Sequence, residues 1–336
     1  MRDYNGNLPI RWNAKMKWSC LTIFAACLLS PAIANAAYPA KRIEVVAAGA
    51  AGGGLDAAGR ALDRALHEAK LLDQPMVINN IQGAAGDAAK NYVNLKKGDS
   101  HILYVESNRI FQNKILGTTA LGVDDFVPVA RLVTEYLVWV VRADAPQRSA
   151  KDILDQIKGD ATSMAFGVGS LPSNDYFNIV RPALLYGADY KKLRIASFKS
   201  GGNLMIQLLG GHVPVISTTL SEALEQVKTG KARVIATSAP SPQGGDLKGV
   251  PHWRGMGIDM HIAHWRGLFA PAGTPREVVA FWDDRLGKLM KTEVWKKILE
   301  QHNWADAFSD SATFRKELEA EREVTAKLLR ELGFAK

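Results

Sequence analysis

The stretch "VVAAGAAGGGLDAAGRAL" (residues 45–62) passes from a strand through a bare loop into a helix, and it decides the fold. Its start lies in "RIEVVAA" (residues 42–48), whose apolar, β-branched residues predict a buried strand. The loop is built of alanines and glycines and ends in three consecutive glycines. Apolar residues then recur at helical spacing: Leu55, Ala58, Leu62, Leu66 and Ala69. The stretch therefore predicts a strand, a tight loop and an amphipathic helix in succession.

The same design recurs immediately downstream. The segment "PMVINN" (residues 75–80) predicts a second strand, and "IQGAAGDAAKNYVNL" (residues 81–95) again gives a Gly/Ala loop, an acid and a helix. A third strand is predicted in "HILYVES" (residues 101–107). Because strands alternate with helices, we expect an α/β fold with a parallel sheet and helices on its faces.

The alternation continues to residue 240 and predicts a second, similar unit. The apolar segments 138–142 and 265–270 are the expected crossings between the units. Domain 1 is therefore predicted to comprise residues 37–138 and 266–336, and domain 2 residues 139–265. We expect each domain to hold a mainly parallel sheet flanked by helices, with the C-terminal helices packed on domain 1.

Residues 1–36 have the pattern of an export signal. Basic residues precede the apolar run "WSCLTIFAACLLSPAI" (residues 18–33), and "ANA" (residues 34–36) supplies the small residues of a cleavage site. The run is short for a membrane span, although an uncleaved anchor is the alternative. Met16 offers an alternative start, and "FAAC", ending at Cys27, loosely resembles a lipoprotein box, so lipidation stays open. We expect a signal peptide over residues 1–36 and a mature protein in the periplasm.

The composition narrows the class of protein further. Both cysteines lie in the predicted leader, so the mature chain is expected to use no disulfide or thiol chemistry. Removal of residues 1–36 takes away four basic side chains and one acid, so the formal net charge falls from +8 to +5. This mild excess suits an anionic ligand, but no Lys/Arg cluster with interleaved aromatics marks a nucleic-acid surface. No nucleophile and base can be paired, and His252, His261 and His264 lack the spacing of a metal site. We therefore expect no catalytic residues, no metal, no cofactor and no nucleic-acid partner.

The two Gly/Ala loops are suited to hold an anion. The first turn of a helix has backbone N–H groups without internal partners, and the helix dipole places partial positive charge there. Small residues let a ligand approach that backbone closely. The simpler alternative is a tight turn that only lets helix pack on strand. A dinucleotide site is disfavoured, since Gly52, Gly54 and Ala57 fit G-x-G-x-x-A but Asn79 and Asn80 stand where that site needs an acid.

Taken together, the motifs resemble the receptors of tripartite tricarboxylate transporters, the periplasmic solute-binding family also called Bug receptors. The resemblance extends from residue 38 to the C-terminus and rests on four stretches in order: "YPAKRIEVVAAGAAGGGLDAAGRAL", "VINNIQGAAGDAAKNYV", "LLGGHVPVISTTLSEALEQVKTGKARVIATSAP" and "WRGLFAPAGTPREVVAFW". It implies a two-domain, type II-like periplasmic binding protein that closes on its ligand like a flytrap. It also implies capture of a carboxylate between the domains and delivery to a membrane permease.

The resemblance implies three sets of ligand-binding residues. The loop after the first strand supplies Gly49, Ala50, Ala51, Gly52 and Gly53, with Asp56 opening the helix. The loop after the second strand supplies Gly83, Ala84, Ala85, Gly86 and Asp87. Domain 2 is expected to close the far side with Gly169, Ser170, Ser173, Asn174, Ser200, Gly201, Gly202, Ser217 and Thr218. Asp56 and Asp87 either only cap their helices and interact with the helix dipole, or they bind a hydroxyl or amine of the ligand or fix their glycine loops.

One departure from the family pattern bears on the charge of the ligand. Family members often carry an acid after the strand that here ends in "VISTT", where this chain has Thr218. A hydroxyl can donate a hydrogen bond to an anion and an ionised acid cannot, so we expect this change to favour a second carboxylate on the ligand. Arg266, near a predicted crossing, could reach the ligand or brace the hinge, and the sequence does not choose.

The leading prediction is a monomeric periplasmic receptor that captures a small organic acid, such as a di- or tricarboxylate, for a permease. A cleft enzyme on the same scaffold, either a hydrolase or a transferase, is one alternative. A receptor that feeds a signalling partner is another. Binding is favoured over catalysis because the chain lacks a nucleophile–base pair and a cofactor motif. The identity of the carboxylate is open.

Overall fold

The computed structural model describes residues 38–198 and 201–335, and these belong to one compact unit. The three strands predicted first are β1 (Ile43–Ala47), β2 (Met76–Asn80) and β3 (Ile102–Glu106), and β1 lies between the other two with parallel pairing on both sides. Each strand leads into a helix; these helices are α2 (Gly54–Glu68), α3 (Asp87–Asn94) and α4 (Arg109–Ile115). The predicted leader, over residues 1–36, lies outside the described residues.

The long strand β4 (Phe126–Arg142) belongs to both halves of the sheet. Its first half pairs antiparallel with β9 (Ala263–Pro271) and β10 (Ala305–Ser309). Its second half pairs antiparallel with β7 (Val215–Thr219) and β8 (Ala232–Thr237). The order is β2-β1-β3-β9-β4-β7-β5-β6, where β5 (Ala165–Val168) is parallel to both β7 and β6 (Arg194–Ser197). The prediction of mainly parallel sheets is therefore wrong: both halves are mixed, because β4 and β9 run against the strands beside them.

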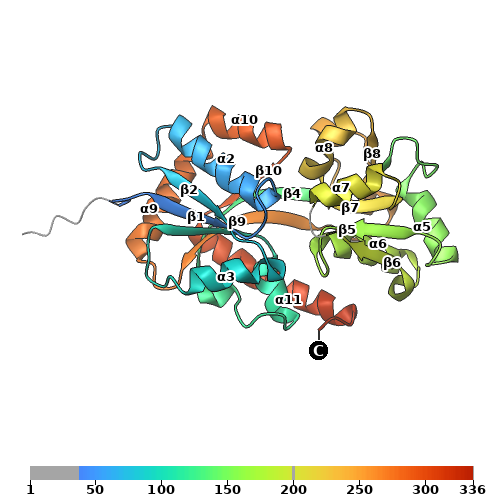
Figure 1. Cartoon of the computed structure of the whole chain (residues 1–336), viewed down its shortest axis with the longest axis horizontal. Helices are drawn as coiled ribbons and strands as arrows, with labels where there is room; N and C mark the ends of the chain where they lie inside the picture. Colours follow the sequence, from blue (N-terminus) through green and yellow to red (C-terminus); the bar gives the residue numbers. More distant parts are fainter. Residues whose placement is uncertain (1–37, 199–200, 336) are drawn as a thin grey trace, which may run out of the picture. The chain divides into compact units, whose positions relative to one another are not determined.

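Helices cover both faces of the strands (Figure 1). In that view α2 and α10 (Glu293–His302) lie above β1 and β2, and α3 and α11 (Ser311–Glu331) lie below them. The remaining helices are α5 (Ala150–Gly159), α6 (Asn174–Tyr186), α7 (Gly201–Leu209), α8 (Leu220–Lys228) and α9 (Arg276–Leu289). Among the described residues, none of these helices has the length and apolar character that a membrane crossing requires.

The buried apolar side chains fall into separate clusters. One draws on residues 43–133 and 265–318, and two others draw on residues 138–260. The predicted domain boundaries remain a prediction, with the change of cluster along β4 as their support. A fourth cluster joins Leu329 and Leu332, at the end of α11, to Phe177 and Val180 of α6. The C-terminal helices were expected to pack on domain 1, and Phe314 and Leu318 of α11 do lie in the first cluster. The last turns of α11, however, pack against α6.

Candidate functional site

The loop after β1 is partly bonded within itself. The N–H groups of Gly49 and Gly53 donate to Ala47 O (2.8 Å) and Ala50 O (3.1 Å), and that of Gly52 donates to Asp56 Oδ2 (2.9 Å). Within the part of the chain that the structure describes, no side chain caps α2 and the N–H groups of Ala50, Ala51 and Gly54 have no acceptor. Part of the predicted amide cradle is therefore internally satisfied, and its remainder surrounds the start of α2.

Asp56 fixes this loop. Asp56 is 3% exposed. Its Oδ2 accepts a hydrogen bond from Gly52 N–H (2.9 Å), and Arg60 Nε donates to both carboxylate oxygens (3.0 and 2.9 Å). Burial opposes its ionisation, but the hydrogen bonds from Arg60 and Gly52 outweigh burial and lower the pKa of Asp56. The contacts of Asp56 are those of a residue that fixes the glycine loop, since its oxygens already hold Gly52 and Arg60.

The loop after β2 adopts a strained backbone. It forms a single 3₁₀ turn over Ala84–Gly86, in which Ala84 and Ala85 have φ of 45° and 52°. Side chains with a Cβ rarely occupy this left-handed region, and such strain often accompanies binding sites. Asn113 donates to Ala85 O (3.1 Å) and to Asp87 Oδ1 (3.0 Å), which also accepts from the fully buried Lys90 (3.0 Å). Asp87, like Asp56, therefore holds its loop in place.

Two residues that the sequence analysis missed tie the loops together. Arg109, at the start of α4, pairs with the fully buried Glu106 at the end of β3 (3.0 Å). The same guanidinium donates to Ala48 O in the first loop (2.8 Å). A Cβ on Gly86 would lie 3.1 Å from the Glu106 carboxylate, so the second loop packs against the same pair. Since parallel strands meet at one edge, the acid that ends the third strand was the available signal.

Arg266 lies against the start of α2. A Cβ on Gly54 would lie 3.1 Å from Arg266 Cζ and nearer still to Nη2, so only glycine leaves room for the guanidinium. Arg266 is 4% exposed and forms an ion pair with the buried Glu135, and its Nε has no hydrogen-bond partner among the described residues. The side chain therefore brings a cation to the first turn of α2.

Three of the residues predicted from domain 2 are used internally. Ser173 caps α6 by accepting from Tyr176 N–H (3.2 Å), and Ser217 is buried and accepts from Asn178 (3.0 Å). Asn174 is buried between α4 and β9, where it bonds Gln112 (2.6 Å), Asn108 (3.0 Å) and His264 (2.8 Å). These side chains position α6 and β7, and none offers a free polar atom in this conformation.

The other predicted residues of that half are loop backbone. Gly169 and Ser170 follow β5. Their carbonyl oxygens accept hydrogen bonds from the hydroxyls of Ser197 (3.3 Å) and Ser173 (2.8 Å), respectively. Gly201 and Gly202 begin α7, and a Cβ on Gly202 would meet nothing within 4 Å. Ser200 lies outside the described residues. The structure thus leaves Gly202 with open space beside it.

Thr218 was expected to offer its hydroxyl to a second carboxylate of the ligand, and its contacts differ from that expectation. Thr218 is 1% exposed, and its hydroxyl donates to the carboxylate of Glu222, one turn into α8. Its hydroxyl is therefore already used, and Glu222 places near this strand end the negative charge that was thought to be missing. Glu222 was not predicted as a site residue because this acid lies four residues beyond the position where the family carries its own.

The histidines in the segment after β8 do not form a metal site. Burial, reinforced by Arg266 and Arg109, holds the pKa of His264 well below its ordinary value, so the ring is neutral at neutral pH. Its Nδ1 lies 2.8 Å from the Asn174 amide. Within residues 38–198 and 201–335, no group of three His, Cys, Asp or Glu side chains could hold a metal.

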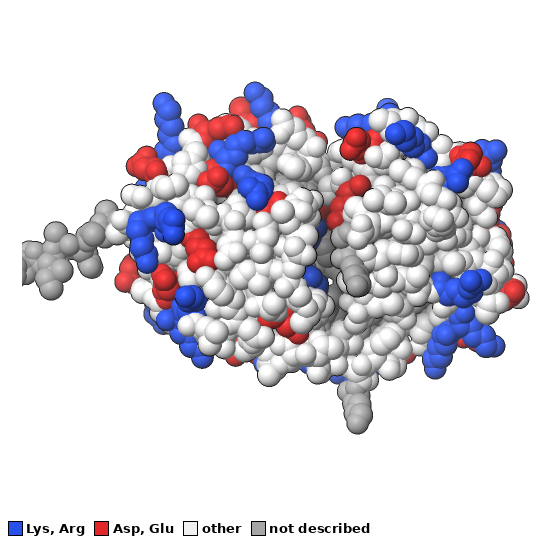
Figure 2. Space-filling view, in the orientation of Figure 1, with Lys and Arg blue, Asp and Glu red and all other residues white. Residues whose placement is uncertain are grey.

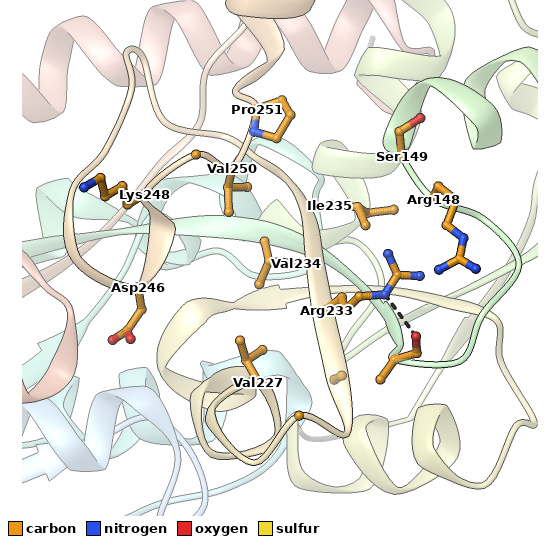
Figure 3. A pocket seen from close by; sticks show the side chains of 14 residues that line it. Arg148, Ser149, Val227, Arg233, Val234, Ile235, Asp246, Lys248, Val250 and Pro251 are labelled. Carbon is orange, nitrogen blue, oxygen red and sulfur yellow. Dashed lines mark hydrogen bonds between the residues drawn. The ribbon is translucent and has the colours of Figure 1, made fainter.

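A hollow of about 630 Å³ lies elsewhere, beside β8 (Figure 3). Val234 and Ile235 form its floor, and Arg148, Arg233 and Lys248 stand at its sides. The Arg233 guanidinium is already bonded to backbone oxygens of the 143–147 turn, including Ala143 (3.2 Å). None of the predicted ligand-binding residues lines this hollow. On the face shown in Figure 2, charges of both signs are interspersed, without a basic expanse.

The sequence and the fold of this chain are similar to those of known proteins. The profile described as "Tripartite tricarboxylate transporter family receptor" matches residues 60–334. The chain belongs to the tripartite tricarboxylate transporter receptor family. This receptor is 24% identical to protein BugT of Bordetella pertussis over 276 residues, which cover 81% of this chain and 82% of BugT.

Solved structures agree with the receptor fold. A TctC solute-binding protein from Polaromonas, without ligand, is 26% identical, with a TM-score of 0.68 over 88% of this chain and 99% of that one. R. palustris Rpa4515 with adipate is 20% identical, with a TM-score of 0.80 over 89% and 99% of the two chains. The predicted family and fold are therefore confirmed. Tripartite tricarboxylate receptors are periplasmic solute-binding proteins and not enzymes, so the cleft-enzyme alternative is set aside.

Proposed function

We propose that this receptor binds a small carboxylate at the carboxyl ends of β1 and β2 and passes it, in the periplasm, to the permease of a tripartite transporter. The observation that carries this proposal is the start of α2. There the amides of Ala50, Ala51 and Gly54 have no acceptor among residues 38–198 and 201–335, and Arg266 lies beside Gly54. The adipate in the R. palustris structure supports the ligand class.

The energies of such a site are adequate for a transport receptor. A hydrogen bond from an amide to a charged group contributes roughly 1.5–3 kcal/mol. Four of them at the upper end of that range total about 12 kcal/mol, and an association cost of about 4 kcal/mol then leaves about −8 kcal/mol, which is micromolar affinity. The dipole of the 15-residue helix α2 adds to this attraction.

The remaining parts of the proposal follow from the chain's organisation. The leader over residues 1–36 is proposed to be cleaved after export. The predicted domain boundaries near residues 138 and 265 would let the two halves close on the ligand. We propose that the receptor acts as a monomer.

Thermal-shift screening of the purified protein against carboxylates, followed by calorimetry, tests the ligand class. A carboxylate that raises the melting temperature and is recovered unchanged supports the proposal. Ala51→Asp, which adds a negative charge to an exposed position of the first loop, should weaken binding at least tenfold. Ser241→Asp, in an exposed loop elsewhere, is the matched control and should bind normally. Failure of every carboxylate, or equal binding by Ala51→Asp, would overturn the proposal.

Uptake is tested separately in cells. A strain lacking the receptor should lose accumulation of the labelled carboxylate, and a strain lacking the permease should lose it equally. Accumulation that persists without the receptor would exclude the transport role and leave signalling as the remaining alternative.

A further inference from the structure

Three carboxylates from different elements lie near enough to the Arg266 guanidinium to interact with its charge. Glu135 lies in β4, Asp175 in the first turn of α6 and Glu222 in the first turn of α8. Glu135 Oε2 accepts a hydrogen bond from Ser221 (2.6 Å), the residue before Glu222. Asp175 follows Asn174, which bonds His264, and His264 lies opposite Glu135 in the strand register. The contacts therefore bring α6 and α8 to the same point on the sheet.

Arg266 connects this acidic group to the amide end of the site. Its guanidinium forms the ion pair with Glu135 and also packs on Gly54 in the first turn of α2. It is more than nine-tenths buried, and its Nε finds no partner in the described segments, so the cation still has hydrogen-bonding capacity at that turn. The site is thus bipolar: one end offers amides and a guanidinium, and the other offers carboxylates.

The carboxylate end holds more acids than cations. Glu135 is neutralised by Arg266, but among the described residues no Lys or Arg forms an ion pair with Glu222 or Asp175. Desolvation and then the charge of Glu222 raise the pKa of Asp175 to about 8, and desolvation followed by Glu135 raises the pKa of Glu222 in spite of the bond from Thr218. Glu222 remains exposed, so water offsets part of its desolvation, and a ligand can reach it.

We infer that the ligand carries a protonated amine as well as a carboxylate, and that Glu222 and Asp175 bind this amine while the start of α2 binds the carboxylate. The inference rests on the proposed function and reverses the expectation drawn from Thr218. A second carboxylate would meet the Glu222 carboxylate and be repelled. An ammonium group donates hydrogen bonds to Glu222 and favours ionisation of Asp175, which is protonated at neutral pH when no ligand is bound.

Matched ligands of one chain length test the inference. Calorimetry should show 4-aminobutyrate binding at least tenfold more tightly than butyrate, which lacks the charge, and than succinate, which reverses it. The series 5-aminovalerate, valerate and glutarate repeats the comparison at the next length. If succinate or glutarate binds more tightly than its amino counterpart, or if the amine adds nothing to butyrate or valerate, the inference is wrong although the carboxylate receptor stands. If no compound of either series and no other carboxylate binds, the proposed function itself fails.

Variants locate the amine. Glu222→Gln with Asp175→Asn should weaken binding of the amino compound at least tenfold and strengthen that of the matched dicarboxylate. Glu225→Gln, an exposed acid on the same helix, is the control and should change neither affinity. Far-ultraviolet circular dichroism confirms that each variant is folded before binding is compared. Equal losses for the amino compound and the dicarboxylate in the double variant would overturn the assignment.

Discussion

Replacing Gly54 with alanine should destabilise the protein, against the usual helix preference. Alanine is favoured over glycine inside a helix by about 1 kcal/mol. Here the new methyl group would stand 3.1 Å from Arg266 Cζ and nearer to Nη2, where carbon and nitrogen atoms normally keep about 3.5 Å. Overpacking of this kind costs about 1–3 kcal/mol, and the displaced guanidinium is one half of a buried ion pair. We expect a net loss of about 1–2 kcal/mol in the free energy of unfolding.

Urea denaturation at constant pH measures this loss, and Gly287→Ala is the matched control. Gly287 also lies in a helix, α9, but a Cβ there would meet nothing within 4 Å, so the change should stabilise by about 0.5–1 kcal/mol. In a Glu135→Gln/Arg266→Leu background the guanidinium is gone, and Gly54→Ala should then cease to destabilise. A wild-type or higher stability for Gly54→Ala alone would show that Arg266 does not rest on this turn.

Three further changes test separate parts of the structure. Arg266→Leu should cost about 3–5 kcal/mol because it strands the buried Glu135, and Glu135→Gln in the same chain should recover most of that loss in urea denaturation. The raised pKa of Asp175 means that the folded state binds more protons than the unfolded state between about pH 4 and 8, so stability should fall as the pH rises through that window, and Asp175→Asn should flatten the fall. Ser149→Ala removes the side chain that accepts from Asp152 N–H at the start of α5, and it should lower the free energy of unfolding by about 1 kcal/mol; an unchanged midpoint would contradict that role.

Local pattern sufficed for the elements that carry the glycine loops. The strands β1, β2 and β3 and the helices α2 and α3 follow from runs of apolar residues whose period changes at a glycine, and such signals need no knowledge of distant residues. The direction of β4 and β9 could not be predicted from local pattern, because these strands pair with strands that are distant in the sequence. The strand β10, "ADAFS", was also missed, since its alternation is weak and it is defined by pairing with β4.

The electrostatic character of the site could not be predicted for the same reason. Arg266 and Glu135 stand 131 positions apart, and only the β4–β9 register makes them neighbours. Glu222 attracted no attention as an ordinary acid in the first turn of a helix, where acids usually interact with the dipole. The expectation that a hydroxyl replaces an acid near Thr218 was drawn without knowledge of the contact between Thr218 and Glu222.

The bond from Arg109 to Ala48 O, together with its pair to Glu106, clamps both glycine loops to the rigid end of β3. Their conformational entropy is consequently lost during folding and not at the moment of capture. A solute should meet a preorganised surface there, and cutting the clamp with Arg109→Leu should appear in calorimetry as a larger entropic penalty of association.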